Sequence, residues 1–400
     1  MEKQITEYLN QFDFDVRKTQ DGRFMDQKCT PDVVCAVCEC VVEFTKNNPN
    51  IRFTKNDIWH SEYANNLITE SFSKPSLSEE NAANEYDKFF SQPLKTLAYA
   101  NILDEEKVGI TNYYTVKNAE VLQYISLRER NALFFLNCFL TKTMEDCDII
   151  QPFNIFFQQQ DRASLNVLRN RLVQLYHNHT DIKGDLEPPR IYNKIINILA
   201  FKRKVKGAVR GNVSANTLTI DEIRYNRVNW RDMNKDKAIS RQAYKELFQQ
   251  NIGEGEGYYK YAVQKAKKFI RQLHPYSEIH RFPEYPGLQA HHIFMESEFP
   301  EIADYPENII CITPNQHFYR SHPNNRTALI DPDYQLICLL CKLDSIEINN
   351  RAGNENYSLS DFINVLNVGL DTDVFTLQMD YEEIKHQIVK NVHNYGKILL

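Results

Sequence analysis

The chain has 400 residues, of which 42% are hydrophobic and 25% are charged, and its formal net charge is −6. This composition lies near the globular average and excludes a collagen-like, low-complexity or strongly charged disordered chain. Because single cores usually stop growing at roughly 250 to 300 residues, the length predicts more than one domain.

The N-terminus and the cysteines bear on the compartment. The segment MEKQITEYLNQFDFDVRK is charged and amphipathic, and no stretch of the chain approaches about 18 uninterrupted apolar residues. The nine cysteines are scattered and odd in number, unlike those of a disulfide-stapled secreted domain. We therefore expect neither export nor membrane association, and a cytoplasmic location.

Charge is distributed unevenly along the chain. Residues 161–281 hold 24 Lys and Arg against 12 Asp and Glu, which leaves the remaining residues strongly acidic. Such segregation favours a basic surface for a phosphate backbone, although a solvated charged face would give the same pattern.

Residues 1–50 are predicted to form a helical N-terminal unit, and residues 51–160 a winged-helix-like region with core helices. Amphipathic segments follow Thr54, a new helix is expected to open at Ser91 and Pro93, and an alternating segment surrounds Gly109. Three helices and then a hairpin is the order of a winged helix, whose third helix often enters the major groove. Lys95 is thus a candidate for reading bases, unless the region is purely structural.

Residues 161–250 are basic and are predicted to contain a DNA-contacting loop. The run FKRKVKGAVRGN mixes cations with two glycines, so backbone amides and side chains could approach phosphates together. The candidate residues are Lys202, Arg203, Lys204, Lys206 and Arg210. The segment NIGEGEG at 251–257 is expected to be a linker.

The segment after this linker is predicted to be an amphipathic helix over 258–273. Its apolar face would pack on a core, and Lys260, Lys267 and Arg271 on the other face would either contact DNA or be solvated. A second apolar helix is expected near 334–343. Residues 346–400 are expected to add further helices.

Residues 287–322 concentrate four of the chain's 11 histidines. Apolar residues around His291 and His292 predict a strand, and ENIICIT predicts a second one. Thr313 and Pro314 suit the start of a helix that carries His317. Neighbouring strand residues point to opposite faces, so the two adjacent histidines should have different partners.

In residue types, order and spacing, His291, His292, Asn308 and His317 resemble the motif of the HNH, or ββα-metal, nucleases. The resemblance implies that His292 is a general base, that Asn308 fixes the loop and orients His292, and that His291 and His317 hold one divalent metal. Mg²⁺ is the expected ion, with Mn²⁺ as the alternative. An imidazole suits the role of base because its ordinary pKa of about 6.5 lies near working pH.

His322 is a further candidate ligand whose spacing departs from the family. The nuclease colicins, which the segment also resembles, have a second helical histidine four residues after the first, and here the interval is five, with Ser321 at the expected place. One extra residue turns a side chain by about 100° on a regular helix. Ligation by His322 therefore requires a helix end or a bulge.

The cysteines do not predict a structural zinc. Many HNH proteins carry two CxxC pairs around the motif, whereas Cys338 and Cys341 lie on an apolar helix and Cys35, Cys38 and Cys40 on another. Such cysteines are usually core residues.

The wider sequence is similar to HNH-type Type II restriction endonucleases, in RKTQDGRFMDQKCTPDVV, IDEIRYNRVNWRD and the HNH block. This resemblance implies an α+β, mostly helical chain with a catalytic module at 258–345 and helical and winged-helix-like DNA-recognition regions. It further implies cleavage of double-stranded DNA to 5′-phosphate and 3′-hydroxyl ends, a bacterial source and a cognate DNA methyltransferase. Cutting both strands needs either a homodimer or successive cuts.

Three alternatives remain. The first is an HNH DNase with a homing, phage or nonspecific role, and the second is a winged-helix regulator with an inactive HNH module. The third, PD-(D/E)xK chemistry, has only Asp26-Gln27-Lys28 in its favour, because the nearby Pro31-Asp32 comes after that segment rather than before it.

Overall fold

The computed structural model describes residues 2–72, 82–184, 186–209, 211–225, 254–322, 330–354 and 356–395. The chain forms two compact units, Met1–Tyr258 and Tyr259–Leu400. Helices dominate the described residues, and the strands found there form two-stranded antiparallel sheets, β1–β2, β3–β4 and β5–β6. The expectation of a mostly helical α+β chain is confirmed at this level.

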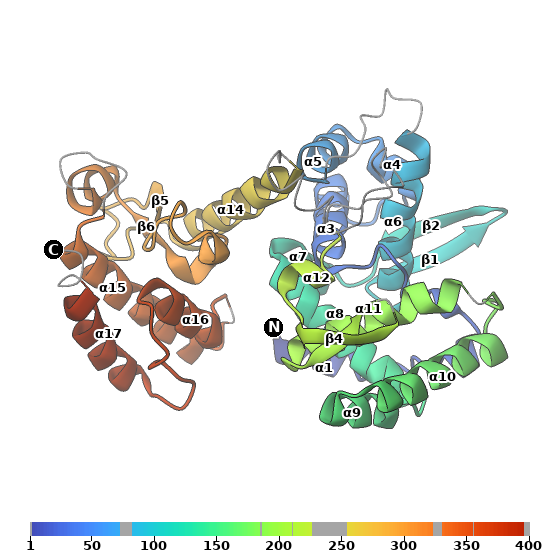
Figure 1. The fold of residues 1–400 in the computed structure, drawn as a ribbon. Helices are drawn as coiled ribbons and strands as arrows, with labels where there is room; N and C mark the ends of the chain where they lie inside the picture. The colour runs from blue at the N-terminus through green and yellow to red at the C-terminus, as the bar shows by residue number, and fades with distance from the viewer. Residues whose placement is uncertain are drawn as a thin grey trace, which may run out of the picture. The chain divides into compact units, whose positions relative to one another are not determined.

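The first unit is a helical assembly with two hairpins (Figure 1). Its elements are α1 (Glu2–Leu9), α2 (Val16–Thr19), η1 (Gly22–Phe24), α3 (Pro31–Thr45), α4 (Lys55–Trp59), α5 (Glu62–Phe72), α6 (Ala82–Tyr99), β1 (Leu103–Val108), β2 (Thr111–Val116), α7 (Ala119–Leu127), α8 (Glu129–Asp146), α9 (Ile150–Gln159), α10 (Arg162–His179), α11 (Glu187–Lys202), β3 (Lys206–Val209), β4 (Asn212–Thr217) and α12 (Ile220–Ile223).

Helix α3 is the centre of this unit. It begins at Pro31, as its sequence predicts, and packs against α6, α7 and α8. Most of its residues are buried, including Cys35, Cys38 and Cys40, so these three cysteines belong to the core.

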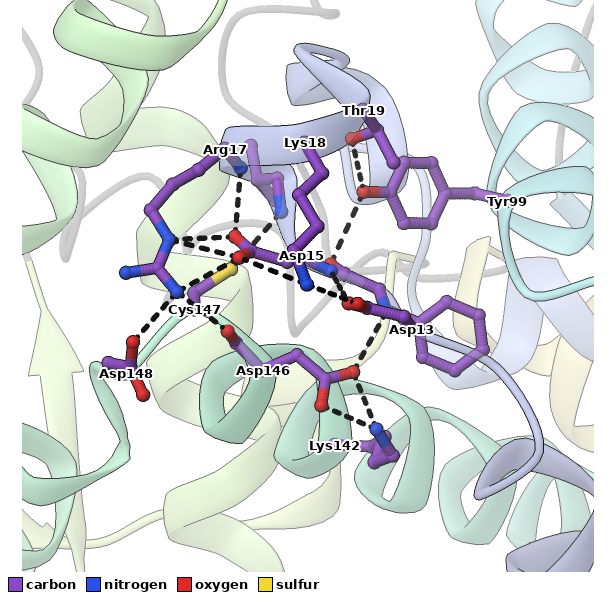
Figure 2. A network of polar contacts seen from close by, with 12 residues as sticks. Asp13, Asp15, Arg17, Lys18, Thr19, Tyr99, Lys142, Asp146, Cys147 and Asp148 are labelled. Atoms are coloured by element: carbon purple, nitrogen blue, oxygen red, sulfur yellow. Dashed lines mark hydrogen bonds and ion pairs between the residues drawn. The ribbon is translucent and has the colours of Figure 1, made fainter.

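A polar network attaches residues 13–19, which follow α1, to the end of α8 (Figure 2). The Phe14 amide donates to Asp146 Oδ2 at 2.8 Å. The Arg17 guanidinium donates to Asp15 and, at 2.7 Å, to Asp148 Oδ2. The segment between α1 and α3, which contains α2 and η1, is therefore held in place by specific bonds.

Helix α6 corrects the prediction of a new helix at Ser91 and Pro93. One helix runs from Ala82 to Tyr99 with Pro93 inside it. Proline removes a backbone donor and costs about 3 kcal/mol in a helix interior. Phe89, Phe90, Leu94 and Leu97 are all buried, and their packing offsets this cost.

The basic segment 202–211 is also not the predicted loop. Among its described residues, Lys202 ends α11 and Lys206–Val209 form β3, which pairs with β4. Arg210 lies outside the described residues. Gly207 lacks a side chain because a Cβ there would lie 2.4 Å from Leu218 Cδ1 and 2.6 Å from Asn197 Oδ1. Packing, rather than phosphate contact, accounts for this glycine.

The second unit begins within α14 (Glu254–Leu273), so residues 254–257 of the expected linker are helical and 251–253 lie outside the described residues. The other elements are β5 (Gln289–His292), η2 (Pro300–Ile302), η3 (Pro306–Asn308), β6 (Ile309–Ile312), η4 (Gln316–Ser321), α15 (Pro332–Arg351), α16 (Leu359–Gly369) and α17 (Tyr381–Tyr395). One hydrophobic core joins α14, β6, α15, α16 and α17. The segments expected at 258–345 and 346–400 thus lie in one unit.

A buried ion pair lies beneath β6. Lys342 Nζ is 2.8 Å from Glu278 Oε2, both side chains are fully buried, and the Cys311 amide donates to Glu278 Oε1 at 2.7 Å. Lys342 also donates to Tyr357 Oη at 3.0 Å, and His274 Nε2 lies 2.6 Å from the same oxygen. The network fixes β6 to α15.

This network predicts a pH-dependent stability. Burial, with Lys342 and Arg281 nearby, lowers the pKa of His274 to about 4, although Glu278 opposes the shift. The unfolded chain therefore binds more protons than the folded one between pH 6.5 and about 4, and stability should fall as pH falls through this window. At about 1.36 kcal/mol per pKa unit the loss has an upper limit of about 3 to 4 kcal/mol. Solvent screening reduces it further, because the ring is about one-fifth exposed.

Urea denaturation at several pH values would measure the effect. His274→Gln should flatten the profile over this window, and His386→Gln, at an exposed position on α17, should leave it unchanged. Equal profiles for wild type and His274→Gln would contradict the assignment.

Candidate metal centre

The predicted strand, loop, strand, helix order is present in the second unit. Strands β5 and β6 are antiparallel, with His291 opposite Ile310 and His292 opposite Ile309. The Gln316 amide donates to Thr313 Oγ1 at 3.2 Å, and the Thr313 amide donates to Gln316 Oε1 at 2.8 Å. This reciprocal pair caps the following helical turn, as expected for a threonine three residues before a glutamine.

The helical segment is a π-turn, Gln316–Ser321, and this resolves the spacing of His322. A π-turn follows an i→i+5 pattern, so residues five apart return to the same side. Ser321 Oγ donates to the Gln316 carbonyl at 3.2 Å. His322 follows with an extended backbone, and its ring centroid lies 5.0 Å from that of His317.

His291, His317 and His322 converge. One ring nitrogen of each lies within 4.8 Å of the others, and the ring of His291 is 5.2 Å from that of His317 and 5.1 Å from that of His322. His291 and His322 are buried. The structure brings together all three residues that the sequence suggests as metal ligands.

The chemistry of this cluster fits a divalent metal. Burial, together with the neighbouring imidazoles and Lys267, lowers the pKa of His291 well below its ordinary value, and burial, His322 and Lys267 lower that of His317. The imidazoles of His291 and His317 are therefore neutral near pH 7, which is the state that binds metal. His317 Nδ1 is buried and makes no hydrogen bond to any described residue.

The donor set bears on which ion would bind. Imidazole nitrogens suit zinc and other late transition metals, whereas Mg²⁺ prefers oxygen ligands. Three histidines thus favour an ion softer than Mg²⁺, and the expected Mg²⁺ stays a prediction.

His292 has a different partner from His291, as strand alternation predicts. Its Nε2 lies 2.8 Å from the Ala303 carbonyl oxygen, which can only accept, so Nε2 carries the proton. Nδ1 then holds the lone pair of the neutral ring and lies 3.7 Å from Glu296 Oε2. Burial first, and then Lys267, lowers the pKa of His292, which keeps the ring unprotonated near neutral pH.

Asn308 anchors the loop and does not face the reacting groups. Its side chain is fully buried, accepts from the Phe294 amide at 2.9 Å, and donates to the carbonyls of Phe294 and Ile302 at 3.0 and 3.3 Å. Ile302 directly precedes Ala303, whose carbonyl holds His292. Asn308 is therefore a positioning residue.

A cavity of about 620 Å³ opens on the three clustered histidines and on His292. Its lining includes all four of them and three residues that the motif alone does not identify as site residues: Tyr259, Lys267 and Glu296. Lys267 Nζ lies 3.4 Å from Glu296 Oε2. Of the proposed DNA-contacting residues on α14, Lys267 thus lies at the site, whereas Lys260 and Arg271 are exposed.

The other predicted DNA-contacting residues lie in the first unit. Lys95 on α6 is partly buried and pairs with Asp21 and Glu105, which weakens its case for reading bases. Lys202, Arg203 and Lys204 are exposed at the end of α11, and Lys206 begins β3. Arg203 lies over the Phe157 ring, with its guanidinium carbon 5.1 Å from the ring centroid.

The remaining cysteine candidates are also in the core. Cys338 is buried and Cys341 half-buried on α15, and burial raises the pKa of both thiols. Burial disfavours the thiolate that a metal would need. Within the described ranges, the converging metal-ligating side chains are the three histidines.

No family model matches the chain, and neither a curated protein nor a solved structure matches it. None of the helices in the described ranges is long and apolar enough to span a bilayer.

Proposed function

We propose that the chain is a metal-dependent endonuclease that hydrolyses phosphodiester bonds of double-stranded DNA by a one-metal HNH mechanism. The observation that carries the proposal is His292 with Nε2 held by a backbone carbonyl and Nδ1 free to take a proton, in the same cavity as three converging histidines. A base and a metal site around one cavity are what phosphodiester hydrolysis requires.

The residues have separate roles in this proposal. His291, His317 and His322 hold the metal, which supplies a positive charge for the phosphate and the leaving oxygen. His292 Nδ1 accepts the proton of the attacking water, and Nε2 stays hydrogen-bonded to Ala303, which keeps the ring in place. The Asn308 side chain donates to the backbone carbonyls of Phe294 and Ile302, and so positions the neighbouring Ala303 carbonyl.

The finer proposal is a Type II restriction endonuclease, accompanied in its bacterial host by a cognate methyltransferase and acting in the cytoplasm. It is supported by the similarity of the sequence blocks and by the order of α4, α5, α6 and the β1–β2 hairpin, which is that of a winged helix. The first unit would then recognise duplex sequence. An inactive HNH module is disfavoured because the metal cluster, base and positioning residue are all intact.

Incubation with plasmid DNA tests the proposal. With Mg²⁺, Mn²⁺ or Zn²⁺ we expect discrete fragments, and EDTA should prevent their formation. A smear would indicate a nonspecific nuclease and contradict the restriction role. Intact plasmid with every metal would contradict nuclease activity.

A further inference from the structure

Helix α14 contributes two polar side chains to the cavity that the HNH motif does not account for. Tyr259 and Lys267 lie eight residues apart on this helix, and both line the cavity together with His291 and His292. The Lys267 side chain is only 19% exposed, although lysine is normally solvated. Burying the Lys267 ammonium group costs free energy in the unliganded protein, so its position in the cavity points to a function.

The Tyr259 hydroxyl is a donor without an acceptor among the described residues. Its oxygen is buried and makes no hydrogen bond to any described residue. Buried polar groups are nearly always paired, so an unpaired one on a residue that lines a cavity indicates a ligand that completes it. Burial, with Glu296, Asp304 and Glu301 nearby, raises the pKa of Tyr259 to about 12, so the group stays a neutral donor.

The Lys267 charge acts directly on the site. Lys267 lines the same cavity as His291, His292 and His317, so its ammonium group adds positive charge beside these imidazoles. Among the described lining residues, Glu296 is the carboxylate that balances it. A divalent ion on the three histidines would leave the cavity with a net positive charge, which suits an anionic ligand.

We propose that Lys267 and Tyr259 form a phosphate-binding subsite, which holds the DNA backbone phosphate that enters the cavity. Lys267 exchanges its contact with Glu296 for a phosphate oxygen, and the Tyr259 hydroxyl donates to the same group. As a binder of DNA phosphate, the subsite rests on the proposed nuclease function. A phosphate supplies acceptors for both groups and relieves the charge that the metal adds.

A chemical-shift titration with inorganic phosphate in EDTA tests the subsite without metal and without cleavage. Lys267→Gln should weaken phosphate binding about tenfold or more, because it removes a charged hydrogen bond, and Tyr259→Phe should weaken it several-fold. Glu296→Gln should strengthen it, since the competing carboxylate is gone. If Lys267 and Glu296 were only a structural pair, the two substitutions would not change phosphate affinity in opposite directions.

Lys268→Gln is the matched control, because it makes the same change at an exposed position on α14 and should bind phosphate like wild type. Circular dichroism verifies that each variant is folded. The proposal is overturned if wild type does not bind phosphate, or if Lys267→Gln and Tyr259→Phe both bind it within about twofold of wild type.

Binding and cleavage measurements with duplex DNA distinguish the subsite proposal from the nuclease proposal. Lys267→Gln should lose one phosphate contact. In EDTA, the slope of log DNA affinity against log salt concentration should therefore decrease in magnitude by about one in this variant. If phosphate binding depends on Lys267 but no metal supports cleavage, the nuclease proposal fails and the subsite, as an anion site, stands. If DNA is cut and Lys267→Gln cuts with unchanged kcat and KM, the subsite fails and the nuclease stands.

Discussion

His292→Ala should reduce the rate of DNA cleavage by about 10²- to 10⁴-fold, the range that a general base contributes. The substitution removes Nδ1, the nitrogen left unprotonated by the 2.8 Å bond between Nε2 and Ala303. Affinity for DNA and for metal should stay near wild type, because His292 is not part of the three-histidine cluster. Single-turnover cleavage at saturating enzyme measures the rate, and filter binding in EDTA measures the affinity.

His386→Ala makes the same change on the exposed face of α17 and should cut at the wild-type rate. A normal cleavage rate for His292→Ala would refute its assignment as the base. Loss of metal or DNA binding along with the rate would point to a folding defect instead.

The second large effect concerns His322, whose role as a metal ligand the sequence did not decide. His322→Ala should weaken metal binding about as strongly as His317→Ala, by at least tenfold, because each removes one of three nitrogen ligands. Binding of Co²⁺, followed by its visible absorption, gives the affinities, with His386→Ala again as the control. Wild-type affinity in His322→Ala would show that His322 is not a metal ligand.

The same titration has an expected pH dependence. Metal binds the neutral imidazole, and burial and the neighbouring imidazoles lower the pKa values of His291 and His317. Affinity should therefore fall as pH falls, but the fall should begin below the ordinary histidine pKa of about 6.5. A fall that is complete near pH 7 would contradict the lowered pKa values.

Much of the candidate site could be predicted from the sequence because its residues are close in the chain. His291, His292, Asn308 and His317 lie in two strands and a helix whose spacing sets their relative positions. For His322 the sequence predicted the condition for ligation, a bulge or helix end, but not whether it is met. That depends on the i→i+5 bonding of the π-turn, which no residue type signals.

The parts that the sequence did not predict depend on packing between distant segments. Tyr259 and Lys267 reach the cavity because α14 packs on the same core as β6, and helical periodicity alone placed Lys267 on a DNA-facing or solvated side. Similarly, Pro93 suggested a helix start, but the buried side chains around it keep α6 continuous. Gly207 suggested a phosphate loop, whereas the neighbouring Leu218 side chain explains it.

Gly369, the last residue of α16, connects the C-terminal helices to the chemistry. A Cβ at this position would lie 2.4 Å from the ring of Phe294, and the backbone of Phe294 is what the Asn308 amide holds. A larger residue at 369 would therefore displace the same loop whose Ala303 carbonyl sets the tautomer of His292. A genetic screen for loss of cleavage should thus return substitutions in α16, far along the chain from every histidine of the site.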